Sequence, residues 1–267
     1  MHAGRAACDR VGGGVGLPGI LEIEAAPGVR AVFTTRERGV SRGPWRGANL
    51  AVSTGDSPED VRANRRELCE ALAIEPADVS MLTQVHGATV HSLRAPLSAG
   101  RFCGDLDGWP EGDALSTSGE GLPLMVLAAD CVPVLIWRQD GGAVAAAHAG
   151  WKGTIGGVLQ RAAWSLGEGD LAAAIGPCVS RAAYEVSPEL AARFVDRFGA
   201  GVVDGRMLDL PACAQLCLQE AGVSGAAIHR TGRCTVSEPD RFFSHRRDGA
   251  PTGRQAAIIW RTSENPR

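Results

Sequence analysis

The sequence predicts a single mixed α/β (α+β) domain. Short apolar runs typical of buried strands alternate with stretches whose apolar residues recur at helical spacing, which is the pattern of a mixed fold. No internal repeat, low-complexity linker or charge run marks a domain boundary within the 267 residues. We therefore expect one folded domain over residues 21–267, preceded by a flexible, glycine-rich leader over residues 1–20.

The first half of the chain is expected to contain one helix among several strands. The helix begins after Ser57, because Ser57 can cap it, Pro58 suits the first helical position and Asp60 completes a capping-box variant. Its apolar stripe ends at about residue 73. The expected strands are residues 30–35, 79–83, 88–93, 122–128, 132–137 and 143–147, with a long Gly/Pro-rich loop over residues 95–112.

The second half alternates strands with helices. Gly141 and Gly142 lie between two of the expected strands, as in a hairpin turn. The expected elements after that hairpin are helices at residues 154–166, 187–198 and 211–221, and strands at residues 171–175, 226–229 and 255–260.

Composition excludes several classes of protein. The net charge is −3, which argues against a nucleic-acid binder but leaves a small anionic substrate open. No apolar run is long enough to cross a bilayer, and the N-terminus lacks the apolar stretch of a signal peptide. We expect a cytoplasmic protein that acts on a small molecule, and we predict no protein partner.

The eight cysteines are interpreted as free thiols. No Cys-x-x-Cys pair is present, so a zinc ribbon is not expected. Cys213 and Cys217 lie four residues apart in an expected helix, where they are interpreted as small core residues rather than metal ligands.

Three potential metal ligands, His86, Cys131 and His148, each lie among Gly, Ala or Pro neighbours. Cys131 and His148 directly follow apolar runs that are expected to be buried strands. Two imidazoles and one thiolate form a three-ligand zinc set with one open position, which is the catalytic rather than the structural pattern. The three residues are far apart in sequence, so their spacing alone does not show that they converge.

A series of motifs resembles the YfiH family, also described as the laccase-domain or multicopper polyphenol oxidase family and as the peptidoglycan editing factor family. The match spans roughly residues 30–260, with the motifs in the same order. They are Phe33-Thr34-Thr35-Arg36, Asn49-Leu50, Gly55-Asp56, Gln84-Val85-His86-Gly87, Ala129-Asp130-Cys131-Val132-Pro133, His148-Ala149-Gly150-Trp151-Lys152-Gly153-Thr154, Ile175-Gly176-Pro177-Cys178, Cys234-Thr235 and Phe242-Phe243-Ser244-His245-Arg246-Arg247-Asp248.

The resemblance implies a four-layer fold of mixed sheets flanked by helices, with His86, Cys131 and His148 binding one zinc ion. It also implies several activities: purine nucleoside phosphorolysis, adenosine deamination, phenol oxidation and removal of a wrongly incorporated serine from cell-wall precursors. The chain has six histidines and no His-x-His pair, too few for the several copper ions of a true laccase. Copper remains a second candidate ion in vitro because it competes with zinc for nitrogen and sulfur ligands.

Further site residues are predicted from their positions beside these motifs. Asp130 precedes a ligand and is expected to orient it or to act as a general base, and Lys152 is expected to bind phosphate at a helix start. The family commonly has arginine at the position of Lys152, so the geometry of phosphate binding differs here. Candidate substrate-binding residues in matched loops are Arg36, Asn49, Gln84, Arg246 and Arg247, with His245 and Cys178 as pocket residues.

Three hypotheses follow. The first is a zinc-dependent enzyme that acts on purine nucleosides such as inosine, adenosine and guanosine, with phosphate or water as the attacking group. The second is a cysteine- or zinc-dependent hydrolase that edits peptidoglycan precursors. In its metal-free form Cys131 is the nucleophile, His148 or His86 the base, and Asp130 orients the base. The third is a structural metal protein without enzymatic activity.

Overall fold

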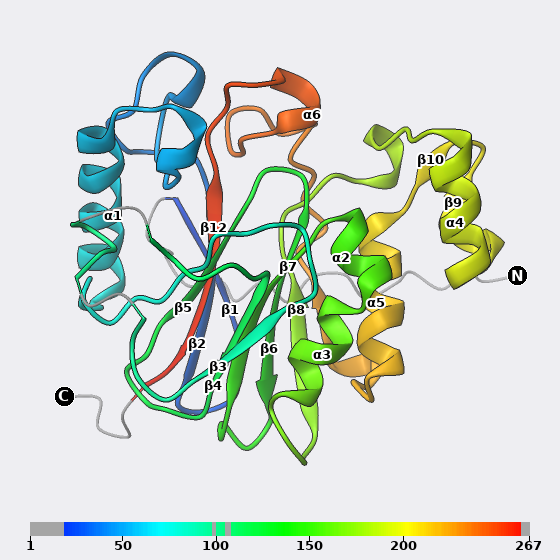
Figure 1. The fold of residues 1–267 in the computed structure, drawn as a ribbon, viewed down its shortest axis with the longest axis horizontal. Helices are drawn as coiled ribbons and strands as arrows, with labels where there is room; N and C mark the ends of the chain where they lie inside the picture. The colour runs from blue at the N-terminus through cyan, green and yellow to red at the C-terminus, as the bar shows by residue number, and fades with distance from the viewer. Residues whose placement is uncertain (1–18, 98–99, 105–107, 263–267) are drawn as a thin grey trace, which may run out of the picture.

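The computed structural model describes residues 19–97, 100–104 and 108–262. Its described elements form four layers: a helix, a four-stranded sheet, a six-stranded sheet and a group of helices (Figure 1). The mixed α/β fold of sheets flanked by helices is therefore confirmed. The expected leader lies outside the described residues except for Gly19 and Ile20, and Ile20 already begins the first strand.

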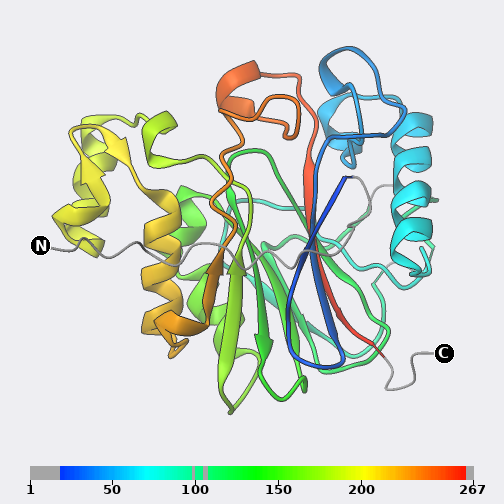
Figure 2. The same ribbon diagram turned by 180° about the vertical axis from the view of Figure 1, so that it is seen from behind.

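The smaller sheet is antiparallel and has the strand order β1–β2–β12–β5. It joins the two ends of the described chain, because β12 lies between β2 and β5. From behind, the blue strands β1 and β2 lie beside the red strand β12 (Figure 2). The strands are β1 (Ile20–Ile23), β2 (Val29–Thr34), β5 (Leu124–Ala128) and β12 (Gln255–Arg261).

The larger sheet has the strand order β11–β8–β6–β7–β4–β3. Its outer pairs, β11 with β8 and β3 with β4, are parallel, and its inner pairs are antiparallel. Gly141 in the β6–β7 turn has a φ of 73°, as the expected hairpin requires. The strands are β3 (Val90–Leu93), β4 (Ala114–Thr117), β6 (Val132–Arg138), β7 (Val144–Ala149), β8 (Leu171–Ile175) and β11 (Ile228–Arg230).

Helices cover the outer faces of the two sheets. Helix α1 (Pro58–Leu72) packs on the smaller sheet through Leu68, Cys69 and Leu72, whereas α3 (Val158–Trp164) and α5 (Leu210–Glu220) pack on the larger sheet. The Ser57 side chain accepts a hydrogen bond from the Asp60 N–H, which confirms the predicted cap. The other helices are α2 (Trp151–Gly156), α4 (Pro188–Phe198) and α6 (His245–Asp248), with 3₁₀ turns at Gly43–Trp45, Val52–Thr54, Arg181–Ala183, Ala200–Val202 and Gly225–Ala227.

The two sheets pack face to face through small and branched apolar side chains. The smaller sheet contributes Phe33, Val126 and Ile259, and the larger sheet contributes Leu135, Ala146 and Ala174 to one buried cluster. The larger sheet's side of this interface includes three alanines, Ala146, Ala172 and Ala174. Such small residues allow the backbones to approach closely, so the sheets form a stiff double layer beneath the loops at one end.

Several expected elements are wrong in detail. Residues 79–83 form no strand and make only isolated bridges at Ser80 and Thr83. The helix expected at residues 154–166 is broken by Gly157, whose φ of 81° no α-helix accommodates. Strands β1 and β4, the small ribbon of β9 (Val203–Asp204) with β10 (Met207–Leu208) and helix α6 were not expected. No helix in the described ranges is long and apolar enough to cross a membrane.

Candidate metal centre and its cavity

His86, Cys131 and His148 converge in the structure. Their ligand atoms all lie within 4.8 Å of one another, so the three side chains could hold one metal ion. Cys131 directly precedes β6 and His148 lies on β7. These strands are neighbours in register, with Pro133 opposite His148. The hairpin therefore places the thiol beside the imidazole, although the two residues are distant in sequence.

His86 reaches the pair from the loop that precedes β3. Its ring packs against His148 edge to face, with ring centroids 4.9 Å apart. Gly150 makes this approach possible, because a Cβ at that position would lie 3.0 Å from both Cys131 Sγ and His86 Cδ2. Thus Gly150 leaves the space in which the three donors meet.

The buried carboxylate of Asp113 organises two of the three donors. Asp113 Oδ1 lies 2.9 Å from His148 Nδ1 and accepts a 3.0 Å hydrogen bond from the His86 N–H. Asp113 Oδ2 accepts hydrogen bonds from the backbone N–H groups of Gly87 (2.6 Å) and Val85 (3.3 Å). Since a carboxylate only accepts, Nδ1 of His148 carries the proton and Nε2 is left for a metal or for the Cys131 thiol.

Two of the four non-glycine residues with a positive φ in the described ranges lie at this site. His86 and Asp130 adopt φ values of 59° and 91°, in the left-handed region that residues other than glycine rarely occupy. Asp113 holds the His86 turn through backbone N–H groups. Asp130 is held by its own carboxylate, whose Oδ1 accepts from the Thr235 hydroxyl (2.5 Å) and whose Oδ2 accepts from the Arg246 N–H (2.6 Å). These bonds fix the turns that aim the ligands.

The donors are electrostatically coupled. Burial opposes ionisation of Cys131, but the charge and hydrogen bonds of His148 and the hydrogen bond of His86 lower the pKa of the thiol to about 6. Burial opposes protonation of His148, but the Cys131 thiolate and the Asp113 carboxylate raise the pKa of this imidazole to about 9. The metal-free site thus favours a thiolate beside an imidazolium, which primes Cys131 as a metal ligand.

The three donors lie on the wall of a cavity of about 680 Å³. This is the volume range of small-molecule sites in proteins. One part of the lining is apolar, and another carries cationic and aromatic side chains. The lining includes Met81, Leu82, Trp109, Leu127, Gln84, Arg65, Tyr184, Leu210, His245, Arg246 and Arg254.

Two arginines give this cavity its positive charge. Arg254 donates through Nη1 to the carbonyls of Thr252 and Gly253. Burial lowers the pKa of this guanidinium, and the charges of Cys131 and Asp130 partly offset that shift. Arg246 stacks over Tyr184 at 5.1 Å and donates to the Glu185 carbonyl. In the part of the chain that the structure describes, neither guanidinium forms an ion pair, so both can meet an anion.

The sequence-predicted substrate residues are scattered. Gln84 lines the cavity, and its side-chain amide donates to the Leu127 carbonyl and accepts from the Leu127 N–H. Asn49 is buried and bonds Asp56, while its Oδ1 accepts from the Arg254 N–H (2.9 Å). Lys152 is exposed on α2, over the Trp151 ring, and is not among the described residues that line the cavity.

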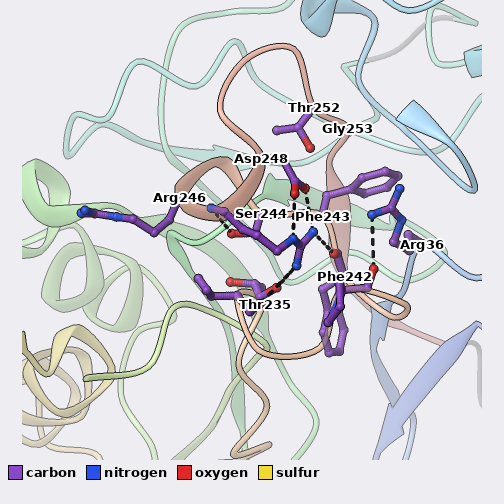
Figure 3. Close-up of polar contacts among 12 residues, drawn as sticks. Arg36, Thr235, Phe242, Phe243, Ser244, Arg246, Asp248, Thr252 and Gly253 are labelled. Atoms are coloured by element: carbon purple, nitrogen blue, oxygen red, sulfur yellow. Dashed lines mark hydrogen bonds and ion pairs between the residues drawn. The ribbon is translucent and has the colours of Figure 1, made fainter. Parts of the chain in front are cut away.

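Arg36 and Arg247 hold the loop around α6. Arg36 stacks over Phe243 at 4.4 Å and donates to the carbonyls of Arg46 and Pro239. Arg247 donates to the carbonyls of Thr235 and Phe242 and pairs with Asp248. Arg36 and Arg246 lie on opposite sides of this loop, with Ser244 and the two phenylalanines between them (Figure 3). Neither Arg36 nor Arg247 is a described lining residue of the cavity.

Of the remaining predicted residues, His245 lines the cavity, whereas Cys178 is buried outside its lining. Sequence reasoning missed Asp113, Arg254, Tyr184 and Arg65. Asp113 and Arg254 each follow a glycine directly before a strand, and that position at a strand end is a signal that could have found both.

Residues 30–262 match the family model described as multi-copper polyphenol oxidoreductase laccase. The chain belongs to this family. A protein named purine nucleoside phosphorylase from Deinococcus radiodurans is 40% identical over 236 residues, covering 85% of this chain and 87% of that protein. Another of that name, from Xylella fastidiosa (strain Temecula1), is 38% identical over 248 residues, covering 88% and 93%.

Solved structures agree with the fold. The crystal structure of YlmD from Geobacillus stearothermophilus has a TM-score of 0.83 at 33% identity, covering 89% of this chain and 93% of that one. A YfiH protein from Bacillus licheniformis has a TM-score of 0.85 at 28% identity, covering 92% and 97%. The relatives named as phosphorylases support an enzyme, and the His-Cys-His cluster could hold a metal ion.

Proposed function

We propose that this protein is a zinc-dependent enzyme that cleaves purine nucleosides by phosphorolysis. The observation that carries the proposal is the joint lining of one cavity by the His86–Cys131–His148 cluster and by the guanidinium groups of Arg246 and Arg254. An anionic co-substrate and a neutral, planar base require this combination of charge and apolar surface. The names of the relatives favour the same reaction.

The donor set fits one zinc ion better than several copper ions. One thiolate and two imidazoles leave a single position open. His91 Nε2 donates to the Glu111 carbonyl oxygen, and His229 stacks on Trp137, so neither stands beside the cluster. Of the described histidines, only His245 shares the cavity with the cluster. A multicopper centre would need more imidazoles at the site than these residues supply.

Each part of the cavity wall has a role in the proposed reaction. A bound zinc ion supplies a Lewis acid that stabilises negative charge developing on the reacting groups. Arg246 and Arg254 hold phosphate, one oxygen of which forms a bond to the ribose C1′ as the bond from C1′ to the purine nitrogen breaks. Trp109, Met81 and Leu82 would provide apolar surface for the purine, and His245, which lines the same cavity, would protonate the departing base.

The test is phosphorolysis of inosine by zinc-loaded protein, followed by chromatography of hypoxanthine and ribose 1-phosphate. Arg254→Ala is expected to raise KM for phosphate about tenfold, since a charge-assisted hydrogen bond is lost. Lys152→Ala is the matched control and should leave this KM unchanged. Absence of both products from protein with a full complement of zinc would refute the proposal. Incubation of adenosine without phosphate tests deamination, because its product, inosine, is separated by the same chromatography.

A second function has one specific observation in its favour. Cys131, His148 and Asp113 form a continuous thiol–imidazole–carboxylate line, which also suits a cysteine hydrolase that edits peptidoglycan precursors. In that case Asp113, rather than the predicted Asp130, orients the base. The position of His86 against the same thiol favours a metal. Turnover of a peptidoglycan precursor by metal-free protein, abolished by alkylation of Cys131, would select the hydrolase.

A further inference from the structure

A second pair of thiols lies away from the metal-site residues, between α1 and the loop that follows β3. Cys69 is on α1 and is only 2% exposed, and Cys103 is partly buried in the loop. Arg65 Nη1 donates to the Phe102 carbonyl (2.9 Å) and Arg62 Nε donates to the Gly104 carbonyl (3.1 Å). Two arginines of α1, about one and two turns before Cys69, thus hold the backbone on both sides of Cys103.

Cys103 packs against the buried apolar cluster that contains Cys69, and the two thiols lie within side-chain hydrogen-bonding range. A side-chain hydrogen bond between them lowers the pKa of Cys103 to about 7 and, together with burial, raises the pKa of Cys69. The two sulfurs therefore have different roles available to them. Cys103 is the accessible and ionisable thiol, and Cys69 is the buried thiol within its reach.

A buried cation strengthens this asymmetry. The Arg65 guanidinium is buried, stacks on Phe102 at 4.8 Å and donates twice to the Leu50 carbonyl. Burial lowers its pKa to about 10, whereas the charges of Cys103 and Cys69 oppose that shift. No carboxylate pairs with Arg65 in residues 19–97, 100–104 and 108–262, and the buried guanidinium therefore favours an anionic sulfur at Cys103.

We propose that Cys69 and Cys103 form a reversible disulfide when the protein meets a peroxide, with Cys103 as the attacking thiol and Cys69 as the resolving thiol. The Cys103 thiolate attacks one oxygen of hydrogen peroxide and forms an S–O bond. The O–O bond breaks, hydroxide departs, and Cys103 becomes a sulfenic acid. The Cys69 sulfur then attacks the Cys103 sulfur, the S–O bond breaks and water leaves with the Cys69 proton. The pair is oxidised by two electrons, peroxide is reduced to water, and a dithiol reverses the bond.

The disulfide would join α1 to one wall of the cavity. Arg65, which grips the Cys103 segment, itself lines that cavity, as does Trp109 further along the same loop. The Trp109 carbonyl accepts from the Thr83 hydroxyl (3.1 Å), and the Thr83 N–H donates to Pro110 (2.9 Å). These bonds tie residues 109–110 to Thr83, three residues before His86. Because the disulfide would restrain the loop that leads to these residues, we expect oxidation to slow amide hydrogen exchange along residues 108–112.

The other described cysteines differ from this pair in their neighbours. Cys213 and Cys217 are fully buried in α5, and burial raises the pKa of these thiols to about 12 and about 11. Cys178 lies opposite Cys234 across an isolated backbone bridge, and burial raises the pKa of Cys178. Burial opposes ionisation of Cys234, but hydrogen bonds with Ser180 and Ser237, rather than with a second thiol, lower its pKa. Cys131 belongs to the metal cluster and is protected when a metal is bound.

The experiment exposes the zinc-loaded full chain to one equivalent of hydrogen peroxide and maps cysteines by non-reducing mass spectrometry. Trypsin leaves Cys103 and Cys131 in one peptide, residues 102–138, so a second cut at an aspartate between them is required. The expected result is loss of two hydrogen atoms, one crosslink between Cys69 and Cys103, and its reversal by dithiothreitol. Slower amide exchange at residues 108–112 should accompany it.

Two variants keep the test sharp. Cys69→Ser should leave Cys103 as a sulfenic acid that dimedone traps, with no crosslink. Cys213→Ser, a matched loss of a buried helical thiol, should give the wild-type crosslink. The proposal is overturned if dimedone labels Cys103 equally in wild type and Cys69→Ser, or if the first crosslink joins any other pair. The wild-type map decides the question even if a variant fails to fold.

Discussion

Cys131 and Cys103 are both ionisable thiols, but their surroundings prepare them for different chemistry. Cys131 directly precedes β6, next to the imidazoles of His86 and His148. Cys103 lies in an irregular loop, next to a second thiol and the guanidinium of Arg65. Imidazole can share a metal with a thiolate, whereas a guanidinium cannot coordinate a metal. The neighbours, rather than the acidity of the thiol, decide between a metal site and a disulfide.

The two regions also differ in how they are held. The metal donors are positioned by strand register, by the buried Asp113 carboxylate and by the close approach at Gly150. The Cys103 segment is positioned by two arginine side chains that reach from α1. The ends of two paired central strands hold ligands within the narrow range of distances that metal coordination needs. Arginine side chains that hold a loop allow the movement that disulfide formation needs.

Replacing Cys131 should have the largest effect. Cys131→Ala removes a metal ligand, so we expect loss of bound zinc and of inosine phosphorolysis. The fall in activity should exceed the roughly 10–100-fold that is typical when a residue hydrogen-bonded to a ligand is replaced. Elemental analysis and product chromatography measure the two effects. Cys103→Ser is the matched control and should retain zinc and activity under reducing conditions. If both variants behaved alike, the contrast between the two thiols would be lost.

Asp113→Asn should produce the next largest effect. The amide keeps the shape of the side chain but loses the charge that fixes the His148 tautomer and weakens the hydrogen bonds to the His86 turn, so zinc affinity should fall about 10–100-fold. Competition with a chromophoric chelator measures this. Asp140→Asn, on the exposed β6–β7 turn, should leave affinity unchanged. Equal affinities for Asp113→Asn and wild type would show that the carboxylate does not support the ligands.

Zinc affinity should depend on pH with a predictable sign. A metal needs neutral His148 and ionised Cys131, whose pKa values in the metal-free protein are raised to about 9 and lowered to about 6. Between these values one proton is displaced from His148, so affinity should fall about tenfold for a drop from pH 7 to pH 6. Below pH 6 Cys131 also binds a proton and the slope should steepen. Affinity that is constant from pH 8 to pH 5 would contradict the coupled pair.

The smallest effect concerns the other thiol. The lowered pKa of Cys103, about 7, means that its alkylation by iodoacetamide should be half-maximal near that pH and gain less than about twofold from pH 7 to pH 8. Cys69→Ala removes the hydrogen bond that lowers this pKa and should shift the midpoint upward. Peptide mass spectrometry of zinc-loaded protein follows the reaction. An unchanged midpoint in the variant would show that Cys69 does not activate Cys103.

Much of the fold could be predicted because its elements carry strong local signals. The apolar run of β8 and the Ser57 cap of α1 are both where the sequence places them. Strand β4 was missed because Ala114–Thr117 is short, half hydroxyl-bearing and recognisable only through its pairing with β7. The break at Gly157 depends on a left-handed conformation that a helical pattern does not reveal.

The candidate site was predictable only in part. The family resemblance implied that His86, Cys131 and His148 bind one zinc ion, and the structure brings the three together. Asp113 could not be assigned, because its contact with His148 depends on the alignment of β4 beside β7. Lys152 was expected at a helix start facing the substrate. The helix begins at Trp151, three residues before the expected start at residue 154, and Lys152 in its first turn is exposed.

The most direct test of the account is X-ray absorption at the zinc edge of zinc-loaded protein. We predict one sulfur scatterer at about 2.3 Å and two imidazole nitrogens at about 2.0 Å, with one lighter atom completing the shell. The sulfur scatterer should disappear in Cys131→Ala and persist in Cys103→Ser. A shell without sulfur in the wild-type protein would contradict the assignment of Cys131, His86 and His148 as the metal centre.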